Sequence, residues 1–147
     1  AQVVIAGAKA GVEKACELAK AAGAKRALVL LVSAPFHSSL LKPASDRLRE
    51  YLADVTFSAP QIPLVNNVDV SVETDVARIK DALVRQAAAP VRWVESVKWL
   101  AAQGVTQVVE CGPGKVLTGL TKRIDGNLTG LAITDPASLA DVRAQLS

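Results

Sequence analysis

The stretch 105–133, VTQVVECGPGKVLTGLTKRIDGNLTGLAI, gives the clearest indication of the fold. It begins with the β-branched run VTQVVE, turns at CGPG, continues at helical spacing through KVLTGLTKRI and ends in the apolar run LTGLAI. Strand, glycine turn, helix and strand in that order are typical of parallel sheets. The sequence therefore predicts an α/β protein that contains a parallel sheet.

Strand and helix also alternate upstream of this stretch, from about residue 60 onward. The run PLVNNV predicts a short buried strand, and a helix is expected to begin at about Val76. An amphipathic helix follows in VRWVESVKWLAAQG and should stop at Gly104. After the quoted stretch, ASLADVRAQL predicts a terminal helix. The alternation extends the parallel sheet expected from residues 105–133.

Residues 1–33 show the same pattern a second time. The apolar runs QVVIAG and KRALVLLVS predict two strands, and a helical stripe that ends at Gly23 lies between them. Together these elements predict a β-α-β unit. A loop at Pro35 then leads to a further helix with Ser38 or Ser39 as its N-cap. Its expected apolar face consists of Leu41, Leu48, Tyr51 and Leu52.

Composition excludes several classes of function for this chain of 147 residues. No run approaches the roughly 20 apolar residues that span a bilayer, and the N-terminus lacks the pattern of a signal peptide, so we expect a cytoplasmic protein without membrane contact. The net charge is +3, but the basic residues are spread out and aromatic residues are few, which does not indicate nucleic-acid binding. Cys16 and Cys111 have no metal-ligand spacing, so free thiols and no metal are expected.

The chain contains no methionine and opens directly on the strand-like run AQVVIAG. A translation product normally starts with methionine, and a domain rarely opens inside its first strand. We therefore expect the chain to be a fragment of a longer protein.

His37 is the single histidine, in the segment ALVLLVSAPFHSSLL between an expected strand and an expected helix. Ligand sites of open α/β sheets lie beyond the carboxyl ends of strands, and imidazole accepts protons near neutral pH. The segment therefore predicts a general base, although a structural histidine is the simpler alternative. The nucleophile motif GxSxG is absent from the chain. Cys16 or Cys111 could serve as a thiol nucleophile, or each could be an apolar core residue.

The run ECGPGKVLTGL resembles a phosphate-binding loop only superficially. A Walker motif requires glycine where the chain has Val109 and Ser or Thr where it has Val116. Two interpretations remain, a helix N-terminus that attracts an anion and a purely structural turn.

Taken together, the motifs resemble the malonyl-CoA:acyl carrier protein transacylases of bacterial fatty acid synthesis. The resemblance lies in KRALVLLVSAPFHSSLLKPA, PLVNNVDV, DALVRQAAAPVRWVESVKWL and ECGPGKVLTGLTKRI, in the order of the family. It implies that the N-terminal half of the enzyme is absent, including the GxSxG serine and the arginine that binds the malonyl carboxylate.

The resemblance implies an α/β-hydrolase-like large subdomain that carries a ferredoxin-like small subdomain. Residues 1–33 would form the second half of the small subdomain, and residues 34–147 the C-terminal part of the large one. In such enzymes malonyl passes from coenzyme A to a serine and then to the phosphopantetheine thiol of acyl carrier protein, without a bound cofactor. The chain alone would then be inactive.

Site residues follow from the same resemblance. His37 matches the catalytic histidine, and Gln86 matches the position whose backbone carbonyl orients it. Phe36 matches a phenylalanine that accompanies malonyl selection in related domains, although simple packing under the loop is an alternative. The basic residues that could meet an acidic carrier protein, or could simply be solvated, are Lys25, Arg26, Lys122 and Arg123.

Two other interpretations stay open at this point. The chain could be part of an acyltransferase domain of a polyketide synthase, or a non-catalytic interaction module on the same scaffold.

Overall fold

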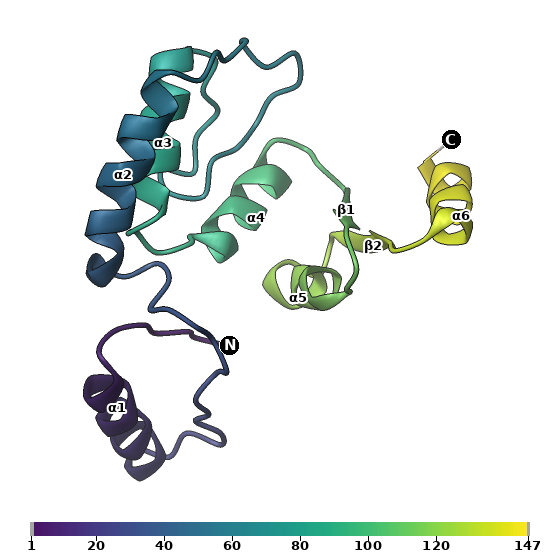
Figure 1. Ribbon diagram of the computed structural model, residues 1–147. Coiled ribbons are helices and arrows are strands. Elements are labelled where there is room, and N and C mark those ends of the chain that lie inside the picture. The colour runs from purple at the N-terminus through teal and green to yellow at the C-terminus, as the bar shows by residue number, and fades with distance from the viewer. Residues whose placement is uncertain (1, 147) are drawn as a thin grey trace. The chain divides into compact units, whose positions relative to one another are not determined.

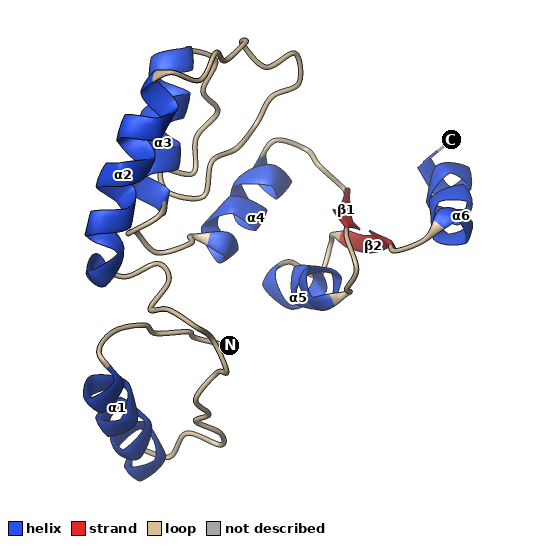
Figure 2. Ribbon diagram, viewed as in Figure 1, coloured by secondary structure: helices blue, strands red, loops and turns tan. Residues whose placement is uncertain are grey.

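The computed structural model describes residues 2–146 and separates the chain into two compact units, Ala1–Val91 and Arg92–Ser147. In the first unit the elements are α1 (Lys9–Ala21), the 3-10 helix η1 (Ser39–Leu41), α2 (Lys42–Ala53) and α3 (Val76–Gln86) (Figure 1). In the second they are α4 (Trp93–Ala102), β1 (Gln107–Cys111), α5 (Val116–Ile124), β2 (Thr129–Ile133) and α6 (Pro136–Leu146) (Figure 2). The expected subdomain boundary between residues 33 and 34 is a different division and stays a prediction.

The second unit is built on a two-stranded parallel sheet. β1 pairs with β2 from Gln107 opposite Thr129 to Cys111 opposite Ile133. Helix α5 connects the strands and contacts both, while α6 contacts β2 and α4 contacts α5. The parallel pairing predicted from the stretch 105–133 is therefore confirmed.

A close approach between α5 and β2 depends on Gly130. A Cβ atom at this position would lie 2.9 Å from the backbone oxygen of Thr118, closer than real Cβ atoms come to other atoms. At the same crossing the hydroxyl oxygen of Thr118 lies 3.0 Å from the carbonyl oxygen of Leu131. The missing side chain at Gly130 thus lets the helix rest directly on the strand.

In the first unit, α2 and α3 lie side by side (Figure 1). Pro43 occupies the first turn of α2, where its missing N–H group costs no hydrogen bond. Asp75 caps α3 by accepting a hydrogen bond of 2.9 Å from the backbone N–H of Arg78. The buried side chains of the pair are Ser45, Leu52, Ala82 and Val84.

Two expectations about α2 are wrong. The side chain of Ser38 does not cap the helix, because its hydroxyl instead donates a hydrogen bond of 2.7 Å to the carbonyl of Pro35, and Ser39 is already part of η1. Tyr51 is not on the apolar face, since 71% of its surface is exposed. In this position the phenol hydroxyl of Tyr51 stays hydrogen-bonded to water, so its exposure leaves no polar group unsatisfied.

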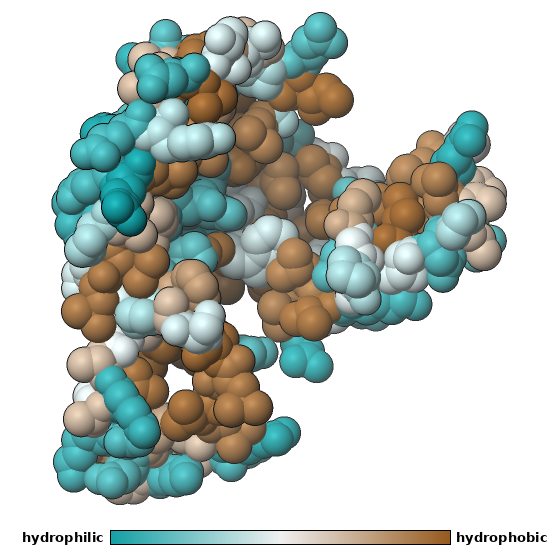
Figure 3. Space-filling model, viewed as in Figure 1, coloured by the Kyte–Doolittle hydropathy of each residue, from teal (hydrophilic) through white to brown (hydrophobic). Residues whose placement is uncertain are grey.

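The strands predicted in residues 2–7 and 25–33 are absent from the described structure, and only the helix between them forms. Their apolar side chains stay in solvent, for example Val3 at 82% and Leu31 at 104% exposure. Figure 3 shows a brown hydrophobic surface beside α1. A helix satisfies its backbone internally, whereas a strand needs a neighbour to pair with, and here neither segment has one.

The strand predicted in PLVNNV is also wrong, since the structure has only an antiparallel bridge between Val65 and Val72. The side chain of Asn66 explains the difference. It accepts a hydrogen bond of 2.7 Å from the N–H of Asp69 and donates one of 3.0 Å to the carbonyl of Ser71. These local bonds compete with strand pairing and close the segment into a turn.

Within residues 2–146, no helix combines the length and the apolar character needed to cross a membrane.

Candidate active site

His37 lies in a tight turn that leads into η1 and α2. Its backbone adopts φ +57°, which is uncommon for a residue with a side chain. The hydroxyl of Ser38 holds the turn by its bond to the Pro35 carbonyl, and the Ser38 carbonyl accepts a hydrogen bond of 3.0 Å from the N–H of Leu41. Such backbone conformations persist where the surrounding structure fixes them, and they concentrate at functional sites.

Two backbone carbonyls, at the end of α3 and just beyond it, hold the ring of His37. Its Nδ1 lies 3.1 Å from the oxygen of Gln86 and 3.2 Å from the oxygen of Ala89. Because carbonyl oxygens only accept hydrogen bonds, Nδ1 must carry the hydrogen. In the neutral ring Nε2 therefore has the free lone pair, and the side chain is exposed.

The hydrogen bond expected between His37 and the carbonyl of Gln86 is therefore present, although the catalytic role of the histidine stays a prediction. The carbonyl of Ala89 as a second acceptor was not predicted. Backbone groups leave no mark in the residue types of a sequence, so only the position of Pro90, which stops the helix, hinted that carbonyls near this end lack helical partners.

A buried side chain adds a third contact at the same helix end. The hydroxyl of Ser45, in the first turn of α2, donates a hydrogen bond of 2.6 Å to the carbonyl of Val84. Val84 lies in the last turn of α3. The carbonyls of this helix end thus accept hydrogen bonds from both α2 and the His37 turn, and sequence reasoning did not identify Ser45.

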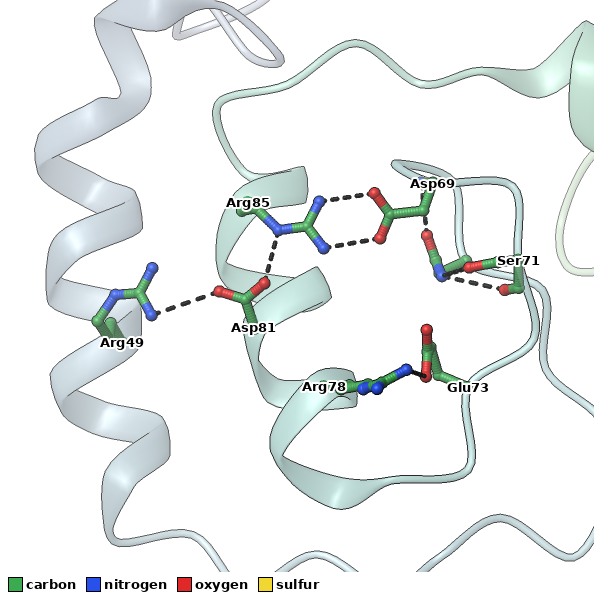
Figure 4. Close-up of polar contacts among 8 residues, drawn as sticks. Arg49, Asp69, Ser71, Glu73, Arg78, Asp81 and Arg85 are labelled. Atoms are coloured by element: carbon green, nitrogen blue, oxygen red, sulfur yellow. Dashed lines mark hydrogen bonds and ion pairs between the residues drawn. The ribbon is translucent and has the colours of Figure 1, made fainter.

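A cluster of charged side chains surrounds this end of α3 (Figure 4). Arg85 donates two hydrogen bonds of 2.7 Å to the carboxylate of Asp69, and its Nε donates one of 2.6 Å to Asp81. Arg49 of α2 lies 3.5 Å from the other oxygen of Asp81. The cluster therefore links α3, α2 and the turn that contains Asp69.

These contacts shift the pKa values of Asp81 and Arg85. The pKa of the Asp81 carboxyl lies below its ordinary value, first because Arg85 donates a hydrogen bond to it. The pKa of Arg85 is raised, first by its hydrogen bonds to Asp69 and then by the bond to Asp81. Both shifts favour the charged forms, so Asp81 and Arg85 stay charged at neutral pH.

Neither thiol takes part in the hydrogen bonds described for the histidine. Cys16, on α1, is partly buried, and Cys111, at the end of β1, is exposed, and both are free. The hydrogen bonds described for the His37 ring go to backbone carbonyls, so neither thiol takes part in them. Within the described residues no group of three or more His, Cys, Asp or Glu side chains could hold a metal ion.

A carboxylate of the chain itself already lies at the N-terminus of α5, next to the glycine-rich turn. The carboxylate of Glu110 accepts hydrogen bonds of 2.7 Å from the N–H of Thr118 and 2.8 Å from its hydroxyl. The pKa of Glu110 is lowered, first by the backbone hydrogen bond from Thr118. Because this carboxylate occupies the helix N-terminus, the structure favours the structural interpretation of the turn.

The other predicted residues are exposed. Phe36 has 51% of its surface in solvent, and its role stays a prediction. Lys122 and Arg123 lie in the last turn of α5, where the helix dipole favours positive charge. Lys25 and Arg26 lie after α1 and are also solvent-exposed. No contact in the described residues distinguishes a carrier-binding role from a solvated surface.

Comparison with known proteins gives a consistent result, although no protein-family model matches the chain. The malonyl CoA-acyl carrier protein transacylase of Salmonella typhimurium is 60% identical over 144 residues, which are 98% of this chain and 47% of that protein. The crystal structure of an acyl-carrier-protein S-malonyltransferase from Burkholderia pseudomallei has a TM-score of 0.90 and 71% identity, and the match covers 92% of this chain and 44% of that one.

A third similar structure is a malonyl-transacylase solved in complex with its type II PKS acyl-carrier protein, with a TM-score of 0.92 and 52% identity. The match covers 95% of this chain and 45% of that one. The chain thus spans about half the length of the relatives it matches. Over nearly its entire length, it is similar in sequence and structure to malonyl-CoA:acyl carrier protein transacylases, which confirms the resemblance predicted from its motifs.

Proposed function

We propose that this chain is the C-terminal part of an acyltransferase that moves malonyl from coenzyme A to the phosphopantetheine thiol of acyl carrier protein in fatty acid synthesis. The enzyme would work without a bound cofactor, and its nucleophilic serine would lie in residues outside this chain. The observation that carries the proposal is the His37 ring, held at Nδ1 by the carbonyls of Gln86 and Ala89 with Nε2 left to act as a base. The identity of 60% to a named transacylase supports it.

In the first half-reaction, Nε2 of His37 accepts the proton of the serine hydroxyl while the serine oxygen attacks the thioester carbonyl. The tetrahedral intermediate collapses, the C–S bond breaks, and the departing thiolate of coenzyme A takes the proton from Nε2. In the second half-reaction the carrier thiol gives its proton to Nε2 and attacks the acyl-serine ester. The serine oxygen then leaves and takes that proton back, which restores the starting state.

The carbonyls of Gln86 and Ala89 contribute to both half-reactions. They hold the ring in one tautomer, with the basic nitrogen directed away from α3. When His37 is protonated, its Nδ1–H still donates to them, and a charged donor forms the stronger hydrogen bond. Neutral acceptors are sufficient for this purpose because a thioester is already reactive.

We also propose the finer architecture, an α/β-hydrolase-like large subdomain with residues 1–33 as half of a ferredoxin-like one. A ferredoxin-like domain contains split β-α-β units, in which another strand separates the two strands of a unit. This arrangement accounts for the exposed apolar side chains of segments 2–7 and 25–33, because their pairing partner would come from residues outside the chain. A cytoplasmic location stays a prediction.

The decisive test is a chimera in which this chain replaces the matching part of the Burkholderia pseudomallei malonyltransferase. We expect the chimera to transfer radiolabelled malonyl from malonyl-CoA to carrier protein, and His37→Ala to reduce the rate by at least about 100-fold. Ser39→Ala, which changes an exposed residue of η1, serves as the matched control and should leave the rate unchanged.

Transfer by the chain alone would contradict this assignment. We expect the unmodified chain of 147 residues to show none, since the proposed nucleophile lies elsewhere. Robust transfer that is lost on Cys111→Ala would place the nucleophile within this chain and give His37 a different partner.

Phe36 and the basic residues refine the substrate and partner of the proposed enzyme. If Phe36 narrows the acyl pocket, the chimera should prefer malonyl-CoA to methylmalonyl-CoA by about 1–3 kcal/mol in kcat/KM, and Phe36→Ala should reduce that preference. Charge reversal at Lys122 and Arg123 should slow transfer to the carrier but not acylation by malonyl-CoA. Comparing fatty acid and type II PKS carrier proteins in the same assay tests which partner the site accepts.

A further inference from the structure

Ser45 forms an unusual hydrogen bond for a serine within a helix. Only 3% of its surface is exposed, and its hydroxyl donates to the carbonyl of Val84 at 2.6 Å. Helical serines commonly bond to a carbonyl of their own helix, whereas this one reaches a different helix 39 residues away in the sequence. Val84 is itself 2% exposed, so water does not readily replace the hydroxyl.

This bond and the bonds of His37 connect the same two segments. Ser45 and His37 belong to one continuous stretch, because the His37 turn runs through η1 directly into α2. Val84 and Gln86 both belong to the last turn of α3. The distance from Nδ1 of His37 to the Gln86 carbonyl therefore depends on how α2 lies against this helix end, and the hydrogen bond of Ser45 joins the two at that point.

Other polar links between α2 and α3 are less suited to this task. The pair Arg49–Asp81 joins the same helices at 3.5 Å, but its side chains are 57% and 45% exposed. Exposed ion pairs at such distances hold their geometry loosely. The bond of Ser45 is shorter, is buried, and ends two residues from the carbonyl that accepts from His37.

We propose that Ser45 is a positioning residue, which keeps the carbonyl of Gln86 within hydrogen-bond distance of the His37 ring and thereby holds the ring in the tautomer with hydrogen on Nδ1. The catalytic consequence rests on the proposed function. The effect on the ring itself depends only on the contacts described for this chain.

The first test uses the fact that His37 is the only histidine. With ¹⁵N-labelled histidine, the two ring nitrogens of the chain report the tautomer directly at alkaline pH, where imidazole is neutral. We expect the Nδ1–H form to dominate in the unmodified chain. In Ser45→Ala the two nitrogen resonances should move toward each other, with at least a threefold rise in the Nε2–H form.

Two variants separate positioning from general loss of stability. Ser45→Thr keeps the hydroxyl and should restore the tautomer ratio of the unmodified chain. Leu52→Val trims a buried side chain in the last turn of α2, so it should lower the melting temperature without changing the ratio. An unchanged ratio in Ser45→Ala, or an equal change in Leu52→Val, would overturn the proposal.

The second test measures transfer by the chimera described above. Ser45→Ala should lower kcat roughly 10-fold with KM for malonyl-CoA unchanged, since a misplaced base affects the chemical steps rather than binding. A shifted tautomer with an unchanged kcat would overturn the catalytic part of the proposal. An inactive unmodified chimera would instead overturn the proposed function, while the tautomer ratio would still decide whether Ser45 positions the ring.

Discussion

The stretch 105–133 and residues 2–33 have the same sequence pattern but different structures. Both were predicted as strand, helix and strand, and in both the helix forms. In the first, β1 and β2 pair with each other along five residues, whereas segments 2–7 and 25–33 remain without strand pairing. The difference shows that apolar, β-branched sequence is not enough for a strand, because the strand also needs a neighbour within reach.

The largest expected effect concerns the exchange of backbone amides. In the chain alone, amides of β1 and β2 should exchange at least about 100-fold more slowly than those of segments 2–7 and 25–33. In the chimera, the two segments should gain at least about 10-fold in protection, because the proposed neighbouring strands are then present. Hydrogen–deuterium exchange followed by mass spectrometry measures both. Equal protection of 25–33 and β1 in the chain alone would contradict the comparison.

Sequence patterns predicted most helices well, because helical hydrogen bonds are local and their signals lie in the helix itself. Gly104 and Pro43 stand at helix ends as expected. The patterns failed where strand pairing decides the structure, as in segment 25–33. They also failed where the hydrogen bonds of one side chain compete with strand pairing, as at Asn66. A local sequence pattern does not show whether a second strand is available for pairing, nor which hydrogen-bond partner a side-chain amide takes.

For the candidate site, the sequence supplied His37 and Gln86 through a family resemblance, and the hydrogen bond between them is present. The carbonyl of Ala89 and the hydroxyl of Ser45 were missed. A backbone acceptor is common to all residues, and a serine in a helix is ordinarily solvated. Only the three-dimensional arrangement of the α3 end distinguishes them.

A substitution at Gly130 tests the close approach that allows the second unit to form its sheet. Gly130→Ala should destabilise the chain by about 1–3 kcal/mol, because the new Cβ would press on the backbone oxygen of Thr118. Gly126→Ala is the control, since a Cβ there has no atom within 4 Å. Urea unfolding followed by circular dichroism measures both. Similar stabilities of the two variants would show that the α5–β2 contact is adaptable.

Glu110 provides a pH-dependent test of the same region. Its folded-state pKa is lowered below the ordinary 4.5, so its contribution to stability is complete above that value and is lost as the pH falls through the folded-state pKa. Glu110→Gln should therefore be less stable than the unmodified chain at pH 7, and the two should converge on acidification.

Thermal unfolding at several pH values checks this expectation. Gln145→Ala changes an exposed residue of α6 that does not titrate, and it should give a constant offset from the unmodified chain over the same range. A difference between Glu110→Gln and the unmodified chain that does not depend on pH would mean that the carboxylate charge does not stabilise α5.

The smallest expected effect compares two ion pairs, one within α1 and one between elements. Lys14 and Glu17 lie 3.0 Å apart on one exposed helix face, so Lys14→Gln should change stability by less than about 0.3 kcal/mol. Arg85 joins α3 to Asp69 by two hydrogen bonds, but its side chain is 41% exposed, so Arg85→Gln should cost only about 0.5–1 kcal/mol. The Arg85 pair joins two parts of the chain, whereas the Lys14 pair lies within one helix. In denaturant titrations, Arg85→Gln should therefore lower the free energy of unfolding more than Lys14→Gln does. Equal effects would mean that the link from Arg85 to Asp69 contributes no more to stability than the exposed ion pair within α1.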